Sequence, residues 1–246
     1  MFPRPTLWAH HCRVHCVGAI DDFRSVLLAK VVGAFSRIEE EADLEAEMVH
    51  EELVSAPMDV TDLLYLDDFE NLACEHGMAY HHTLNTMRQA ALNMLAMTLY
   101  HLFEQQQAFF LDREPPIAPT RRLDKDKTEM DQRMLTYGID CGSFSCSRRL
   151  AELREVANAI KHSKGRASAK LVELRPDLFT SDMLRRIHSE ADLPYQVRVV
   201  ADIAGAPLAG EYIYVTEQHL AEWCEAARAY WTALAEIVDE FRKRTS

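Results

Sequence analysis

The stretch that decides the fold is residues 84–103, which read LNTMRQAALNMLAMTLYHLF. Apolar side chains recur in it at spacings of three and four residues, which is the period of one face of an α-helix. The pattern continues to residue 110, and its apolar members are Leu84, Met87, Ala91, Leu95, Leu99, Leu102, Phe103 and Phe110. It predicts a long amphipathic helix over about residues 67–111, closed by the prolines at positions 115, 116 and 119.

A second long helix is predicted before this one, over about residues 23–54. Asp21 and Asp22 would cap its start and Pro57 would end it. Its first half is apolar and its second half strongly acidic. Two long helices joined by a short link favour an antiparallel helical hairpin, here covering residues 23–112.

The C-terminal half predicts shorter elements: a helix near 127–135, a helix at 143–162, a short helix at 168–174 and a last amphipathic helix at 216–243. Segments 197–201 and 211–215 have strand character and are separated by a glycine- and proline-containing loop, so a small β-hairpin is expected at about 196–215. The expected fold is mainly α: a single domain over residues 1–246, built as a helical bundle with a long antiparallel helical hairpin and one small β-hairpin near the C-terminal helix.

Composition is ordinary for a globular chain, with 48% hydrophobic and 27% charged residues. No run of about 18 apolar residues exists, so we expect no membrane span. The N-terminus lacks the pattern of a secretory signal. Six scattered cysteines fit reduced thiols, and these features together predict a cytoplasmic protein.

Charge is unevenly distributed. The net charge of −12 argues against sequence-blind binding to nucleic acid. Residues 39–52 contain eight acidic side chains and no Lys or Arg, whereas residues 148–175 contain eight Lys or Arg against three Glu. A local basic patch on an acidic protein fits a focused phosphate site. The alternative is that the acidic and basic stretches simply lie against one another.

The basic patch contains the segment REVANAIKH at residues 154–162. At about 100° per residue, an arginine, an asparagine, a lysine and a histidine share one side of the predicted helix, next to an apolar stripe. The polar members are Arg154, Asn158, Lys161 and His162, and the apolar ones are Leu150, Leu153, Ala157 and Ile160. Cations are favoured at a helix C-terminus, and Gly165 would end the helix. Asn is a poor interior helix residue, so its place here indicates a hydrogen-bonding role.

A purely structural interpretation of this segment is equally open. Lys161 and His162 would then only cap the last turn, and Arg154 would pair with Glu152, Glu155 or a neighbouring helix.

Two metal sites are weaker hypotheses. One combines the N-terminal ligand types His10, His11, Cys12, His15 and Cys16 with Cys141 and Cys146, although their spacing is irregular for zinc. The other places Glu75 and His76 beside His81 and His82 in the hairpin, without the Glu-x-x-His motif of bundle metal sites. We therefore expect neither a metal nor a cofactor. Glu104 is a further candidate, as an ion-pair partner that reaches Arg154.

The long helical hairpin, its Glu104-bearing second helix and the later helix from Arg154 to Lys161-His162 resemble the HEPN superfamily of helical domains. The resemblance covers about residues 23–175, and only the helix at 143–162 carries a recognisable motif. It implies a metal-independent ribonuclease or RNA-binding effector of toxin or phage-defence type, acting as a homodimer, with an antitoxin or defence protein as partner. The implied catalytic residues are Arg154, Asn158, His162 and Glu104, and the implied phosphate-binding residues are Lys161, Lys164 and Arg166.

The segment departs from the family motif in its spacing. Seven residues separate Arg154 from His162 where the family motif has four to six, and the residue directly after the arginine, polar in the family, is Glu155. The alternative is therefore a non-catalytic helical module that binds a nucleotide or a partner protein.

Overall fold

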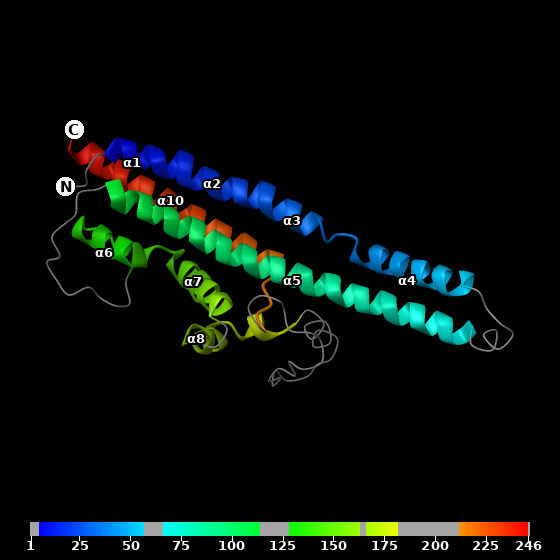
Figure 1. Cartoon of the computed structure of the whole chain (residues 1–246). Helices are drawn as coiled ribbons and strands as arrows, with labels where there is room; N and C mark the ends of the chain where they lie inside the picture. Colours follow the sequence, from blue (N-terminus) through cyan, green and yellow to red (C-terminus); the bar gives the residue numbers. More distant parts are fainter. Residues whose placement is uncertain (1–4, 57–65, 114–127, 163–165, 182–211, 246) are drawn as a thin grey trace.

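The computed structural model describes residues 5–56, 66–113, 128–162, 166–181 and 212–245. Its described segments fold into a mainly helical bundle from which a two-helix arm projects (Figure 1). This agrees with the predicted mainly α class. None of the helices in the described ranges combines the length and apolar character needed to cross a membrane.

The N-terminal region is one continuous helical rod. It consists of α1 (Pro5–His11), the π-helical turn η1 (Cys12–Cys16), α2 (Val17–Asp22), a second π-helical turn η2 (Phe23–Leu28) and α3 (Ala29–Gly33). The predicted helix start at residue 23 is therefore wrong. Asp22 has helical backbone angles (φ −64°, ψ −42°) and no capping bond from its side chain, so the aspartates lie inside the rod. The rod ends in a turn before α4 (Ile38–Ser55).

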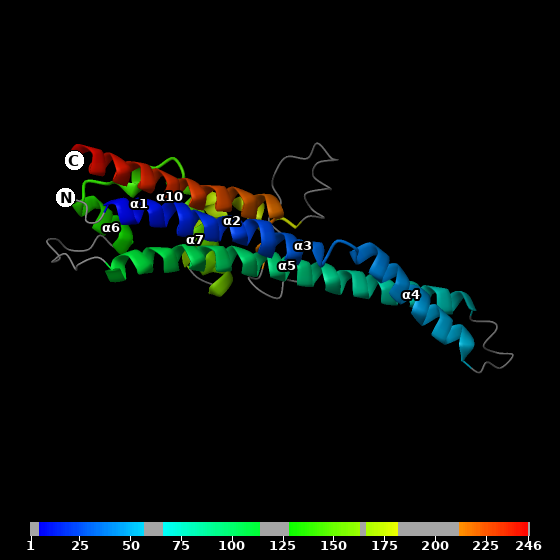
Figure 2. The same ribbon diagram turned by 90° about the horizontal axis from the view of Figure 1, so that it is seen from above.

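Helix α5 (Leu66–Arg113) is 48 residues long, close to the predicted 67–111. At 1.5 Å per residue it extends about 72 Å, so it passes through the bundle and beyond it. Helix α4 lies antiparallel against its first part, so these two helices form a hairpin (Figures 1 and 2), but the predicted first helix over 23–54 is interrupted by the turn at residues 34–37. We call α4 together with residues 66–87 of α5 the arm. Its helices approach closely: a Cβ at Gly77 would lie 2.9 Å from the Cβ of Ala46.

The bundle core lies between the rest of α5, the N-terminal rod, α7 (Ser147–Lys161) and α10 (Glu217–Thr245). Helix α1 contacts α10, so the two ends of the described chain lie side by side (Figure 2). All three tryptophans are buried here: Trp8 is 3% exposed, Trp223 0% and Trp231 1%. The predicted C-terminal helix is thus present within two residues of its expected bounds.

Shorter helices connect these elements. They are α6 (Glu129–Thr136), with a capping box from Thr128, the 3₁₀ turn η4 (Cys141–Ser143), α8 (Arg166–Leu174) and the 3₁₀ turn η5 (Pro176–Phe179). Helix α7 begins four residues later than the predicted 143. Phe144 has extended backbone angles (φ −66°, ψ 141°), which separate η4 from α7.

The predicted β-hairpin at 196–215 lies mostly outside the described residues. Its described end, residues 212–215, forms no strand. The fully buried side chain of Asn93 in α5 hydrogen-bonds the backbone of this segment instead. Its Nδ2 donates to the Ile213 carbonyl (2.8 Å), and the Val215 N–H donates to its Oδ1 (3.3 Å). We call this pair of bonds the Asn93 clasp. Gln89 adds a bond to the Val215 carbonyl at 3.0 Å, so side-chain amides of a helix satisfy this extended segment.

Candidate functional site

Helix α7 is buried on a wider face than the sequence predicted. The expected apolar stripe is buried, and so are three residues on the far side of the helix, Glu152, Val156 and Ala159. The wider face follows from three neighbours, because α7 contacts α5, α8 and α10. The polar side stays accessible: Arg154 and Asn158 are half-buried, and Lys161, His162 and Arg166 are exposed. Lys164 lies outside the described residues.

Arg154 of α7 and Glu104 of α5 both act on Tyr100 of α5. Burial and the Glu104 carboxylate raise the pKa of the Tyr100 hydroxyl, whereas the Arg154 guanidinium lowers it. Tyr100 is thus a shared neighbour of the two predicted site residues. Within the described ranges, no ion pair joins Arg154 to Glu104 itself.

The acidic partners of the structural interpretation are engaged elsewhere. Glu155 forms an ion pair with Lys170 of α8 at 2.7 Å, and the Glu152 carboxylate forms ion pairs with Arg149 and Arg175. In the part of the chain that the structure describes, Arg154 therefore forms no ion pair with either glutamate. The half-buried Arg154 guanidinium therefore keeps N–H groups that are available to donate hydrogen bonds.

His162 lies just past the last turn of α7. Its backbone has left the helix (φ −129°, ψ 46°), and its N–H donates to the Asn158 carbonyl at 3.0 Å. The residue is exposed, and no described side chain hydrogen-bonds its ring. Arg154 and His162 are eight positions apart, which is about 12 Å along the helix axis.

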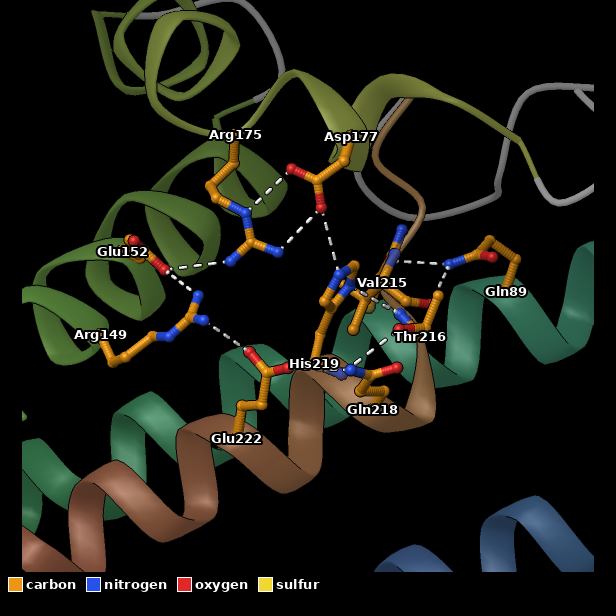
Figure 3. A network of polar contacts seen from close by, with 11 residues as sticks. Gln89, Arg149, Glu152, Arg175, Asp177, Val215, Thr216, Gln218, His219 and Glu222 are labelled. Carbon is orange, nitrogen blue, oxygen red and sulfur yellow. Dashed lines mark hydrogen bonds and ion pairs between the residues drawn. The ribbon is translucent and has the colours of Figure 1, made fainter. Parts of the chain in front are cut away.

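A charged network that the sequence did not reveal holds α7 in place (Figure 3). Its centre is Glu152, which is 4% exposed. One carboxylate oxygen of Glu152 accepts from Arg149 (2.9 Å) and from Arg175 (3.0 Å). Arg149 also reaches Glu222 of α10 at 3.0 Å. The network thus ties α7 to α10 and to the segment after α8.

Arg175 continues the network as a two-pronged donor to Asp177, with Nε and Nη2 at 2.9 and 2.8 Å from its two carboxylate oxygens. His219 Nε2 lies 3.3 Å from the same carboxylate. The hydrogen bond with His219 and the charge of Arg175 lower the pKa of Asp177, against the effect of burial.

His219 also completes the start of α10. Its Nδ1 accepts from the Thr216 N–H (3.2 Å), and the His219 N–H donates to the Thr216 hydroxyl (3.2 Å). This is a capping box with histidine in the place of glutamate. The spacing Thr216-x-x-His219 was the available sequence signal for it. Because its charges are mutually paired, the network is a structural support for α7 rather than a second reactive site.

The two metal hypotheses find no support in the geometry. Among the residues that the structure describes, no group of three or more His, Cys, Asp or Glu could hold a metal ion. Cys12 and Cys16 are core residues, each 1% exposed, and the His11 ring stacks on Phe109 (centroids 4.6 Å apart). Cys12 and Cys16 therefore belong to the apolar core, and His11 is half-buried beside it.

The negative charge of the protein is concentrated in one segment. Residues 38–87, which include the arm, contain 14 Asp or Glu and no Lys or Arg. The other 196 residues carry 27 Lys or Arg against 25 Asp or Glu. The α7 site therefore lies in a part of the chain that is close to neutral, whatever the net charge of −12.

Comparison of the chain with protein-family models, curated proteins and solved structures gave no match.

Proposed function

We propose that this protein is a HEPN-like RNA-binding effector of toxin or phage-defence type that cleaves RNA without a metal, as a homodimer. The observation that supports the proposal most directly is the availability of the arginine and the histidine of the α7 segment, Arg154 and His162. Its arginine forms no ion pair with the adjacent glutamates within the described residues, and its histidine is exposed on the accessible side of the same helix.

The side chains suit phosphodiester cleavage by general acid–base catalysis. His162 accepts the proton of a ribose 2′-hydroxyl, whose oxygen attacks the adjacent phosphorus while the bond to the 5′-oxygen breaks. The leaving oxygen takes a proton from water, which gives a 2′,3′-cyclic phosphate and a 5′-hydroxyl end. Arg154 stabilises the extra negative charge on the phosphoryl oxygens, and Asn158 orients the phosphate.

The neighbouring groups fit supporting roles. Lys161 is exposed in the last turn of α7 and Arg166 at the start of α8, where they can hold flanking phosphates. Lys164 is proposed for the same role from its place in the sequence. Glu104 acts on Arg154 indirectly, through Tyr100, which both residues influence.

The spacing along α7 favours a site made by two protomers. About 12 Å of helix separates Arg154 from His162, which is long for two groups of one helix that act on the same phosphorus. Arg154 of one protomer and His162 of the partner subunit would meet at a two-fold axis between α7 helices. Such an isologous contact places two identical sites in the dimer.

The test is RNA cleavage in EDTA by the wild type, His162→Ala and Arg154→Ala. The matched control is His82→Ala, which removes another exposed histidine on the arm. Cleavage by the wild type and by the control, with loss in both α7 variants, supports the proposal. Equal cleavage by all four proteins, or cleavage that stops on adding chelator, contradicts it.

The second candidate function is a non-catalytic helical module that binds a nucleotide or a partner protein, such as an antitoxin or another defence protein. The acidic arm favours it, because an extended charged surface outside the bundle is suited to protein contacts. RNA retained by the wild type without any cleavage products, and released by Arg154→Ala, would favour this module over the nuclease.

A further inference from the structure

The arm carries a groove along the contact between α4 and α5. Its volume is about 720 Å³. The bottom of the groove is made of small residues that are buried or half-buried: Ala42 and Ala46 of α4 and Ala73 and Gly77 of α5. Small side chains here let the two backbones approach, as the 2.9 Å distance from a Cβ at Gly77 to Ala46 shows. They also leave the groove shallow and apolar.

Carboxylates border this apolar surface. Glu39, Asp43 and Glu47 follow one another every four residues, so they form a row along one side of α4. Glu70 lies on the α5 side, and all four are exposed. Within the described residues none of these four forms an ion pair, because the arm itself contains no lysine or arginine.

Apolar side chains are also exposed on the arm. Met78 borders the groove and is 60% exposed, and Leu44 and Met48 of α4 are each 59% exposed. Of these three side chains Met78 lines the groove, and a large apolar side chain this exposed beside an apolar groove is typical of a surface that a partner covers. The groove runs along two antiparallel helices, which is the shape that receives a third helix.

Charge selects the kind of occupant. A second copy of the arm would bring 12 Asp or Glu against another 12 with no Lys or Arg on either side, and like charges at an interface are strongly unfavourable. A cationic partner meets complementary charge instead. We propose that the arm is the docking site for a basic amphipathic helix of another protein, whose apolar stripe lies on the groove and whose Lys or Arg side chains meet the carboxylate row of α4 and Glu70. This goes beyond the function proposed for α7 and does not depend on it.

A synthetic peptide tests this chemistry directly. The probe is a fluorescent amphipathic helix with the length of α4, 18 residues, that has lysines on one face and leucines and alanines on the other. A second peptide replaces the lysines by glutamates, and a third keeps the lysines but replaces the leucines by serines. Binding to the full-length protein is measured by fluorescence anisotropy in about 0.1 M NaCl, where exposed charges are only partly screened.

The expected result is that only the first peptide binds tightly, and more weakly as salt rises. Asp43→Lys/Glu47→Lys should weaken it about tenfold or more, because both carboxylates face the groove. The control Asp22→Lys/Glu236→Lys makes the same change of charge at exposed positions of the rod and of α10 and should bind like the wild type.

The apolar part has its own pair of variants. Met78→Gln should weaken binding, whereas Met94→Gln, at a 52% exposed methionine outside the groove, should not. Equal binding of the serine peptide, or equal weakening by the two charge variants, would show non-specific attraction to an acidic protein and overturn the proposal. Since none of these positions belongs to the α7 site, RNA cleavage by the variants reports separately on the nuclease proposal.

Discussion

Replacing Asn93 by leucine should destabilise the bundle strongly. The side chain is 0% exposed, and the groups it pairs with belong to Ile213 and Val215, which are 1% and 0% exposed. Leucine leaves one buried carbonyl and one buried N–H without these partners, at about 1–3 kcal/mol each. Its better helix propensity returns about 0.5 kcal/mol. The net loss is roughly 2–5 kcal/mol, a large part of the roughly 5–15 kcal/mol that stabilises a typical domain.

The assay is urea unfolding followed by tryptophan fluorescence, since all three tryptophans are buried in the bundle. Asn85→Leu is the matched control. It makes the same substitution two turns earlier in α5, at an asparagine whose side chain bonds to His81 of its own helix. The control should keep the unfolding free energy of the wild type to within about 0.5 kcal/mol, the gain in helix propensity of leucine over asparagine. If the two variants differ by less than about 0.5 kcal/mol, the clasp does not stabilise the fold in the way argued from its burial.

Three further outcomes follow from single residues. The pKa of Asp177 is lowered in the folded protein, first by its hydrogen bond with His219. The stability that this carboxylate contributes is therefore present above its ordinary pKa of about 4 and is lost as the pH falls below that value. The unfolding free energy of Asp177→Asn should accordingly depend less on pH below pH ~4 than that of the wild type. Native protein should expose one fast-reacting thiol to a disulfide reagent, Cys74, and denatured protein all six. Gly18→Ala, with open space around the new Cβ, should raise the unfolding free energy by about 0.5–1 kcal/mol, whereas Gly77→Ala should lack this gain because its Cβ would meet the facing helix at 2.9 Å.

The long helices could be predicted because their apolar period is sustained. Helices α5 and α10 match the expected ranges within two residues, because the apolar residues of their buried faces recur at the helical period. The part of the N-terminal rod before residue 23 was not predicted, because its apolar pattern includes cysteines. Cys12 and Cys16 looked like metal ligands, but their thiols behave as small apolar groups, and they continue the buried face that Trp8 begins.

The supports of the site could not be predicted in the same way. Glu152 lies on the far side of α7, and its burial is tolerated because Arg175 of a different element joins Arg149 of its own helix in binding the carboxylate. Asn93 lies among apolar residues of α5, and its backbone partners are 120 and 122 positions away. Local periodicity carries no information about such distant pairings, whereas the polar side of α7 follows from the helix alone.

The contact between α1 and α10 has a consequence for synthesis of the chain on the ribosome. Trp8 of α1 is synthesised long before α10, yet the two helices lie against one another. The arm joins residues close in sequence and can form early, but the bundle core waits until α10 has left the exit tunnel. Until then the apolar faces of α1 and α5 lack their final cover, which makes the unfinished chain a natural client for chaperones.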